Sequence, residues 1–549
     1  MWNVIVSYFP KWDVWLQAVM GLCVPYGVSL ALSKNKQPNQ EKSAQEGGVV
    51  AQPSDFTGNL QADITLIQNK FNHQSDVSLR TFCLGKTSQQ AAVFFISSIS
   101  DKKLIETHIL KSLMGELPQI EGGADAAKPP YSKPFILQHA LTVSKVKEAD
   151  TLGEVASELM LGNTVLLIDQ CPGALILSTR KEITRNIQEP PSEALVRGPR
   201  LGFNESIDEN TALLRQHGKN ENLVIARISV GKRVKRELLL TYIADIANPS
   251  LVREVQARIG RLNLDDILES GYIEQLMEDN FLSPFPQVQS TERVDRVLGA
   301  LLEGRVALIM DGTPFALIVP VTFNMLLQSP EDYYDRWIPG TLLRILRYFA
   351  AFISLFGPSL YISFISFHQG LIPTKLALSI AQSRAGVPFP SLIEVLIMEV
   401  SLEILREAGL RLPKPIGQTI GIVGGLVIGE AAVQAGIVSP IMIIVVAITA
   451  ISSFAIPQYN AGIALRMLRF AAMIFAAIFG LYGLVLFFLA ICSHLAKLKS
   501  FGTPYLSPAA PYRFRDWKDF LVRGPLRRMN RRPKMLNVQN QIRHKQQEE

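Results

Sequence analysis

The sequence predicts an α/β cytoplasmic region built from two similar subdomains, followed by an all-α polytopic membrane domain. Residues 33–335 have ordinary globular composition, whereas residues 340–496 hold several apolar runs of about 20 residues, the length that crosses a bilayer. Charged residues make up only 19% of the 549 residues, which fits a chain with a large membrane-embedded part. An internal repeat within the soluble region predicts its two-part build.

The N-terminal end comes before the α/β region and has two parts. Residues 1–33 form an apolar segment in which the stretch 14–32 is long enough to span a membrane, although Pro25 interrupts it. No small-residue cleavage site follows, so an amphipathic anchor, a membrane span and a misplaced start codon remain open. Residues 34–60 are rich in Gln, Lys, Gly and Ser and are expected to be a polar linker.

Two similar stretches, 142 residues apart, predict the duplication. LMLGNTVLLIDQCPGALIL (159–177) aligns without gaps on LLEGRVALIMDGTPFALIV (301–319). In each copy a helix ends at a glycine and two β runs flank a turn that contains an Asp. Each copy therefore predicts a helix followed by a β-hairpin.

The repeat divides the soluble region into subdomain 1, residues 61–184, and subdomain 2, residues 185–335. Strands are also expected at 91–99 and 222–230, each leading into a helical stretch. These two strands extend the match between the copies weakly.

The soluble region shows no pattern of enzyme chemistry. Asp169 and Asp311 occupy the matching turns, where Asp and Gly are the residues that a chain reversal requires, so a structural role is favoured over a catalytic one. A P-loop, a nucleotide-binding glycine fingerprint and a Ser/His/Asp set are missing from the sequence. The four cysteines and seven histidines lack metal-ligand spacing. We expect no enzyme activity, no cofactor and no metal site.

Residues 336–496 are predicted to form the transmembrane domain. The candidate spans are 343–366, 417–437, 440–457 and 467–492. Pro358 lies near the middle of the first, a break tolerated only where neighbours or water satisfy the freed carbonyl groups. The stretch 391–409 is either a fifth span or an interfacial or re-entrant helix. Four spans are favoured, because a soluble region and a basic tail on the same side require an even number of crossings.

The stretch 391–409 is amphipathic. Glu399 and Glu403 share one helical face with Arg406 and Glu407, and apolar residues occupy the other face. Two interpretations are open: an interfacial helix with a solvated charged face, or a helix that lines an aqueous vestibule.

Glu430 is a carboxylate inside the apolar stretch 417–437. Gln434 and Thr419 share its helical face. An intramembrane acid with polar neighbours is by default a site on an ion or substrate path, so pore lining is favoured over helix–helix hydrogen bonding and surface snorkelling. The glycine stripe Gly421, Gly425 and Gly429 is expected to let another helix approach closely. The candidate pore or gating residues are Glu430, Gln434, Thr419, Glu399, Glu403 and Pro358.

Residues 497–549 are predicted to be a basic cytoplasmic tail. Nine Arg or Lys and two Asp between Arg513 and Lys534 give this segment a net charge of +7. Such a segment after the last apolar run is typical of a tail that faces anionic lipid, and nucleic-acid binding is the weaker alternative. Residues 535–549 are expected to be disordered.

Several stretches of the chain together resemble a known family, the A subunit of GerA-type spore germinant receptors. They are EPPSEALVRGPRLGFNES (189–206), PFPQVQSTERVDRV (284–297), EGRVALIMDGTPFALIVP (303–320), SPEDYYDR (329–336) and REAGLRLPKPIGQTIGIVGGLVIGEAAVQAGIVSP (406–440). The similarity runs from about residue 60 to residue 512.

The resemblance implies a sensor of small nutrients in the inner membrane of bacterial endospores, with the soluble region and the tail on the spore-core side. Such a subunit would work with a transporter-like B subunit and a lipoprotein C subunit and would form a homo-oligomer. The family is regarded as a ligand-gated cation channel whose opening starts germination. A non-conducting scaffold or signalling subunit, a secondary transporter and a related channel paralogue stay open as alternatives.

Overall fold

The computed structural model describes residues 55–544 apart from 72–73, 116, 118–130, 144, 182–188, 191, 414–423 and 426. The chain divides into two compact units, and all described residues belong to the second, Ser54–Glu549. The N-terminal apolar segment and most of the linker lie outside the described residues. Residues 55–60, expected to end the linker, belong instead to subdomain 1, because Phe56 and Leu60 are buried in its core.

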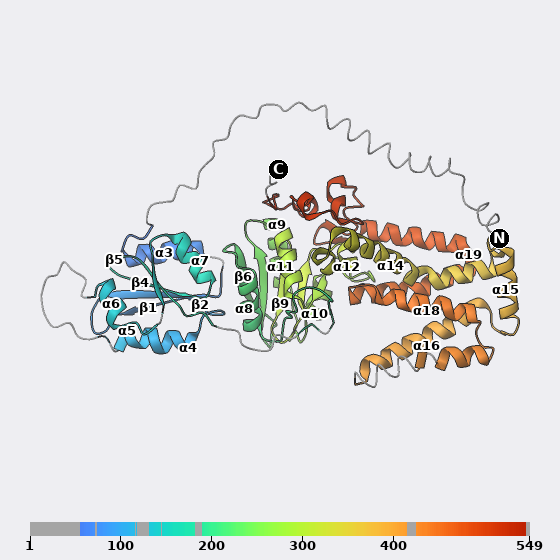
Figure 1. Ribbon diagram of the computed structural model, residues 1–549, viewed down its shortest axis with the longest axis horizontal. Coiled ribbons are helices and arrows are strands. Elements are labelled where there is room, and N and C mark those ends of the chain that lie inside the picture. Colours follow the sequence, from blue (N-terminus) through green and yellow to red (C-terminus); the bar gives the residue numbers. More distant parts are fainter. Residues whose placement is uncertain are drawn as a thin grey trace, which may run out of the picture. The chain divides into compact units, whose positions relative to one another are not determined.

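Subdomain 1 is a five-stranded antiparallel sheet with helices on both faces (Figure 1). The strand order is β1 (Val77–Cys83), β2 (Gln90–Ile96), β4 (Thr164–Ile168), β5 (Cys171–Leu177) and β3 (Val146–Ala149). Helices α3 (Leu60–Lys70) and α7 (Leu152–Met160) cover one face, and α4 (Lys102–Leu104), a π-helical turn (Ile105–Leu110), α5 (Lys111–Gly115) and α6 (Lys133–His139) cover the other. Because both faces are covered, the central strand β4 is buried at every position.

Subdomain 2 repeats this arrangement. Its strand order is β6 (Leu223–Val230), β7 (Arg236–Ile243), β9 (Val306–Met310), β10 (Ala316–Val319) and β8 (Gln289–Thr291). Helices α8 (Ile207–His217) and α11 (Val294–Glu303) cover one face, and α9 (Pro249–Gly260) and α10 (Ser270–Met277) the other. The expected match between 91–99 and 222–230 is wrong: β2 is the second strand of its sheet and β6 the first, so β2 corresponds to β7. β6 also leads into β7 and not into a helix.

The two matching aspartates hold the same structural position in both copies. Asp169 Oδ1 accepts a hydrogen bond from the backbone N–H of Leu60, the first residue of α3, at 3.4 Å. Asp311 Oδ1 accepts one from Ile207, the first residue of α8, at 3.2 Å. A carboxylate at a helix N-terminus satisfies a free donor and is favoured by the helix dipole. Both residues thus lie at the expected turns, and their contact with a helix N-terminus was not predicted from sequence.

A buried ion pair joins the two subdomains. The Arg215 guanidinium on α8 binds the Asp76 carboxylate through Nε at 2.9 Å and Nη2 at 2.8 Å. Both side chains are almost fully buried, at 1% exposure each. Arg215 Nη1 also donates to the carbonyl of Leu223 at 2.7 Å. The paired geometry fixes one subdomain against the other.

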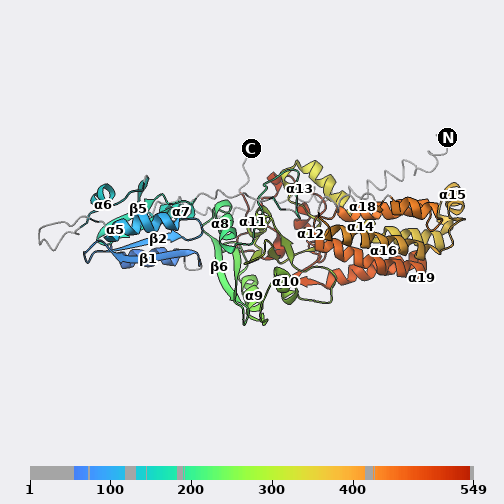
Figure 2. The same cartoon turned by 90° about the horizontal axis from the view of Figure 1, so that it is seen from below.

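Short helices α12 (Phe323–Leu327) and α13 (Glu331–Tyr334) lead from subdomain 2 into a bundle of longer ones, which lie side by side in Figures 1 and 2. The bundle contains α14 (Trp337–Ser366), α15 (Thr374–Arg384), α16 (Ser391–Arg411), a helical stretch at 427–434, α18 (Pro440–Phe454) and α19 (Tyr459–Lys497). Among the described helices, α14 and α19 are long and apolar enough to cross a membrane, and α18 is apolar but shorter.

Helix α19 is a tight hairpin rather than one straight rod. Gly480 interrupts it with a φ of 59° and a ψ of −140°. The rings of Phe475 and Phe487 lie 5.2 Å apart, whereas 12 residues of straight helix would separate them by about 18 Å. The single span expected at 467–492 is therefore wrong, because the chain reverses within it.

Contacts at the helix ends show in which direction each helix of the bundle runs. Residues at both ends of α19 bind neighbouring parts of subdomain 2: Gln458 Nε2 donates to the carbonyl of Ser290 in β8 at 2.9 Å, and His494 Nε2 lies 2.9 Å from Oγ of Ser283 in the connection before β8. The turn at Gly480 lies against Phe367, just past the far end of α14. α16 starts at that far end, where the hydroxyls of Ser366 and Ser391 are 2.6 Å apart.

The helices thus run alternately away from subdomain 2 and back, in the order α14, α16, 427–434, α18 and the two arms of α19. α16 packs against α14, α18 and α19. This path returns the chain to the side on which it began. An even number of crossings was expected because the soluble region and the tail were both assigned to one side of the membrane.

The bundle buries polar residues within an apolar core and exposes apolar residues on its outside. On α16, Glu399 is buried while Ile404 is 65% exposed; on α18, Thr449 is buried while Ile451 is 70% exposed. A water-soluble helix shows the opposite pattern. Apolar side chains facing outward and polar side chains facing inward are the arrangement that a lipid environment favours.

The C-terminal tail folds onto subdomain 2. A short hairpin, β11 (Lys499–Ser500) and β12 (Thr503–Pro504), is followed by 3-10 turns at Phe514–Asp519, Leu526–Arg528 and Lys534–Leu536. Leu536 and Val538 are buried in the core beneath α11. The disorder expected from residue 535 onward is therefore wrong for 535–544, because these residues are folded and two of them complete a hydrophobic core.

Candidate functional site

A charged cluster occupies the interior of the helical bundle. The Glu399 carboxylate on α16 lies 2.6 Å from Arg469 Nη1 on α19, and each side chain is 1% exposed. Both charges are out of water, so each depends on the other for compensation. Glu399 is thus turned into the protein, whereas Glu403 on the same face is partly exposed and Glu407 is exposed.

Glu403, one turn further along α16, faces three arginines. Its Oε1 lies 3.3 Å from Arg406, 3.5 Å from Arg466 and 3.7 Å from Arg469. Two carboxylates therefore meet three guanidinium groups, and the cluster keeps a net positive charge. Arg466 and Arg469 were not among the candidates from sequence. The signal that could have found them is their i, i+3 spacing on an apolar helix, which complements the i, i+4 spacing of the two glutamates.

Several polar atoms in this interior have no hydrogen-bond partner. Within the described part of the chain they include Glu399 Oε1, Arg469 Nε and the hydroxyl groups of Ser354 and Ser359 on α14. A buried polar group without a partner costs free energy, so such atoms are natural ligands for a water molecule or an ion. The bundle interior can therefore bind polar species.

Pro358 lies inside α14, which continues through it as one helix to Ser366. The neighbouring Gly357 allows α18 to approach, because a Cβ at this position would lie 2.6 Å from Thr449 Oγ1. Thr449 therefore faces α14, and Ser453 faces Arg406 at 3.3 Å. Neither hydroxyl faces Glu430.

Glu430 and Gln434 lie on the outer surface of the helical stretch 427–434. Gln434 Nε2 donates to Glu430 Oε1 at 3.1 Å, and both side chains are exposed within the chain. The expected shared face of these two residues is present. Thr419, expected on the same face, lies outside the described residues. The pair therefore points away from this chain's own helices.

The glycine stripe does not bring this helix close to another within the chain. No atom lies within 4 Å of a Cβ built at Gly425, and Gly429 makes only ordinary contact with Ile443 at 3.8 Å. The close approach is at Gly424, where a Cβ would lie 2.8 Å from Leu405. Gly421 lies outside the described residues. Sequence spacing alone could not reveal which glycine the neighbouring helix approaches.

A second ionic contact lies at the far end of the bundle and was missed from sequence. Glu394 on α16 accepts the backbone N–H of Ser439 at 2.7 Å and lies 3.3 Å from Arg384. It is fully buried. It ties the start of α18 to α16 and so fixes the turn that follows Gln434.

Glu274 lies where α10 of subdomain 2 contacts the first residues of α19. Burial, and then the nearby charge of Glu278, raise its pKa to about 7. The Asn460 amide donates a weak hydrogen bond to it at 3.5 Å. An ionisable group is therefore placed at the joint between the soluble region and the bundle.

A duplicated α/β region joined to an apolar bundle with an ionic interior defines a membrane-associated protein. Residues 65–535 match the family described as Bacillus/Clostridium GerA spore germination protein, and the chain belongs to this family.

Two relatives and one solved structure show the extent of the similarity. Spore germination protein A1 of Bacillus subtilis (strain 168) is 46% identical over 413 residues, covering 74% of this chain and 85% of the relative. GerLA of Bacillus cereus is 41% identical over 486 residues, 88% of this chain and 97% of the relative. The N-terminal domain of the A subunit of the Bacillus megaterium spore germinant receptor GerK3 is 32% identical, with a TM-score of 0.39, and covers 49% of this chain and 98% of that domain.

Proposed function

We propose that the chain is a subunit of a nutrient germinant receptor in the spore inner membrane, and that it oligomerises to form or gate a cation channel that triggers germination. The family membership supports the receptor part. The relatives are named as germination proteins and not as an enzyme class. As in the receptors that the sequence resembles, a transporter-like B subunit and a lipoprotein C subunit are the proposed partners.

The Glu430–Gln434 pair is the observation that carries the channel part. A carboxylate held outward between apolar residues costs free energy if that face meets lipid, about 2.5–3.5 kcal/mol at the centre of a bilayer. A second copy of the chain, or a water-filled path between copies, removes that cost. Gly425, which is open within the chain, then becomes available for contact between copies. Several copies would place a ring of Glu430 carboxylates along a path suited to cations.

A variant series tests this role. Glu430→Gln and Glu403→Gln are expected to slow cation release and germination, after a deletion strain screened with amino acids, sugars and nucleosides has identified an effective nutrient. Glu407→Gln is the matched control, because Glu407 pairs with Arg411 at the exposed end of α16. Immunoblots establish that the variants are made at equal levels. Normal germination of both variants would show that the acidic-path assignment is wrong.

A second candidate is a non-conducting subunit that relays nutrient binding to a separate channel. It is favoured by the pairing of Glu399 and Glu403 with arginines, since these acids are then not free to bind a passing cation. Cation flux through liposomes that contain the purified chain separates the two candidates. Flux that Glu430→Gln reduces supports the channel, and saturable uptake of a nutrient would instead support a transporter.

A further inference from the structure

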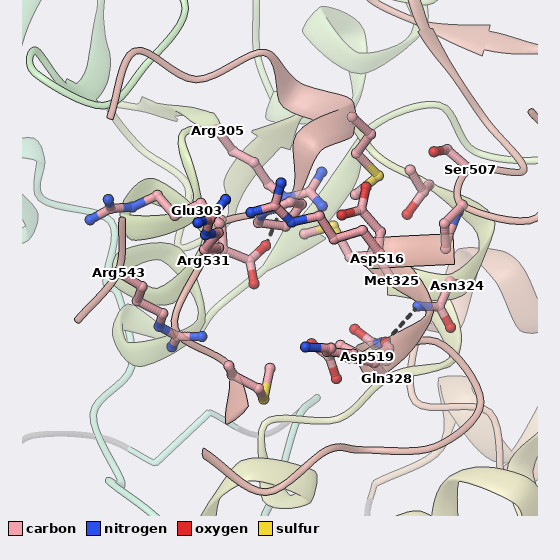
Figure 3. A pocket seen from close by; sticks show the side chains of 18 of the residues that line it. Glu303, Arg305, Asn324, Met325, Gln328, Ser507, Asp516, Asp519, Arg531 and Arg543 are labelled. Atoms are coloured by element: carbon pink, nitrogen blue, oxygen red, sulfur yellow. Dashed lines mark hydrogen bonds and ion pairs between the residues drawn. The ribbon is translucent and has the colours of Figure 1, made fainter. Parts of the chain in front are cut away.

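A basic pocket lies between subdomain 2 and the folded tail (Figure 3). The end of α11 and the region of α12 form one wall, and tail residues between Ser507 and Arg543 form the other. Figure 3 shows Arg531 and Arg543 on one side of the pocket, with Ser507 and Asn324 on the opposite side. The pocket has a cavity volume of about 100 Å³ and opens to solvent.

The pocket carries an excess of positive charge. Its basic residues are Arg305, Arg515, Lys518, Arg528, Arg531, Arg532 and Arg543, and its acidic residues are Glu303, Asp516 and Asp519. Two of the acids are already engaged. Glu303 pairs with Arg305 at 3.4 Å, and Asp519 pairs with Arg344 of α14 at 2.8 Å.

Most of the cations have no acidic partner. Within the described residues, no carboxylate pairs with Arg515, Lys518, Arg528, Arg531 or Arg543. The pKa of Arg532 is lowered, first by burial and also by the charge of Arg543. Uncompensated like charges around one cavity repel one another, and an anion in the cavity removes that repulsion.

Neutral and acidic groups in the wall add hydrogen-bonding capacity. The Ser507 side chain is 1% exposed, lines the pocket, and its hydroxyl has no hydrogen-bond partner. Asp516 Oδ2 is also buried without a partner, while its Oδ1 accepts the backbone N–H of Lys534 at 3.2 Å. The hydroxyl can donate to an anion, and the carboxylate can accept from a protonated phosphate oxygen.

We propose that this pocket binds a phosphate group, carried either by a free phosphate compound or by an anionic lipid headgroup. Guanidinium groups present paired donors that match phosphate oxygens, which is why several arginines around one cavity favour this ligand. A phosphate bound here links the tail to α11 and α12. Through the Asp519–Arg344 pair, the same tail is connected to the start of α14.

The test uses the purified full chain in neutral detergent, with sodium phosphate titrated against sodium chloride at equal ionic strength. Calorimetry is expected to show phosphate binding to the wild type and a loss of affinity of about tenfold or more in Arg531→Gln/Arg543→Gln, because hydrogen bonds to charged groups are lost. The matched control is Arg253→Gln/Arg261→Gln, which removes the same charge from two exposed residues, one on α9 and one directly after its C-terminal end. Lys518→Gln is a second pocket variant in case the double variant does not fold.

A second arm identifies the source of the phosphate. The same proteins are placed in nanodiscs of phosphatidylglycerol or of phosphatidylcholine, and their melting temperatures are compared. Binding of inorganic phosphate in detergent assigns the site to a free phosphate compound. Stabilisation by phosphatidylglycerol alone, lost in the pocket variants, assigns it to a lipid headgroup. If pocket variants and control respond alike to both probes, the proposal is wrong.

Discussion

The carboxylate of Glu399 lies 2.6 Å from the guanidinium of Arg469, across 70 residues of sequence and inside the helical bundle. This ion pair fixes α16 against the first arm of α19. It also explains how a strongly apolar helix carries an arginine in its middle: the charge faces a carboxylate and not the surroundings of the bundle.

Removing one partner of this pair is expected to be costly. Glu399→Gln should destabilise the chain by about 3–5 kcal/mol, because Arg469 is left buried with only the more distant Glu403. Glu399→Leu/Arg469→Met should recover most of that loss, since no buried charge remains. Thermal unfolding in detergent measures both. A single variant as stable as the wild type would contradict the isolation of the pair from water.

The joint between the two subdomains contains one buried and one exposed ion pair, so the strengths of the two can be compared. Asp76→Asn should cost about 3–5 kcal/mol, because Arg215 is then buried beside a neutral amide. Lys70→Gln breaks the exposed pair with Glu221, 3.1 Å apart at the same joint, and should cost less than about 1 kcal/mol. Urea denaturation distinguishes the two. Equal losses would show that burial does not set the strength of this contact.

Stability should depend on pH through Glu274. Its folded pKa of about 7 lies above the ordinary 4.5, so the folded state binds more protons between these values. Stability therefore falls as pH rises through this window and levels off above it. Glu274→Gln should remove this dependence and stabilise the chain at pH 8 by roughly 2 kcal/mol. Melting temperatures at pH 5 and pH 8 measure the effect, with the exposed Glu148→Gln as control; an unchanged pH profile would contradict the prediction.

The reversal in α19 depends on a glycine. At Gly480 a side chain would adopt a positive φ of 59° and its Cβ would lie 2.9 Å from Phe367 and His368. Gly480→Ala should therefore cost about 2 kcal/mol or more. Gly299→Ala is the control, because nothing lies within 4 Å of a Cβ there and the helix α11 is otherwise regular. If the two variants unfold at the same temperature, the hairpin does not require this backbone conformation.

The duplicated α/β region could be predicted because its signals are local. Gly162 and Gly304 end matching helices with positive φ values of 90° and 98°, and Asp169 and Asp311 follow one strand later. Which outer strand of subdomain 1 corresponds to which outer strand of subdomain 2 could not be predicted from sequence. β2 and β6 have similar apolar patterns, and only the pairing between strands shows that they hold different places in their sheets.

The bundle was less predictable, because the hydropathy of a segment does not show where the chain reverses its direction. Residues 467–492 form one apolar run, and a single glycine turns it back without a polar residue to mark the turn. The direction in which the acidic face of α16 points could not be predicted either. Glu399 and Glu403 would form the same stripe on a helix whose charged face meets water. Arg466 and Arg469, with which they pair, lie on α19, so this pairing depends on tertiary structure.

The burial of Leu536 and Val538 beneath α11 has a consequence for the order in which the protein is made. Val538 packs so closely that a Cβ at Gly304 would lie 2.3 Å from its Cγ1. A ribosome releases these residues only after every helix of the bundle has been synthesised. Part of the core of the second subdomain therefore stays uncovered during synthesis until Leu536 and Val538 have been added, long after the subdomain's own strands have been made.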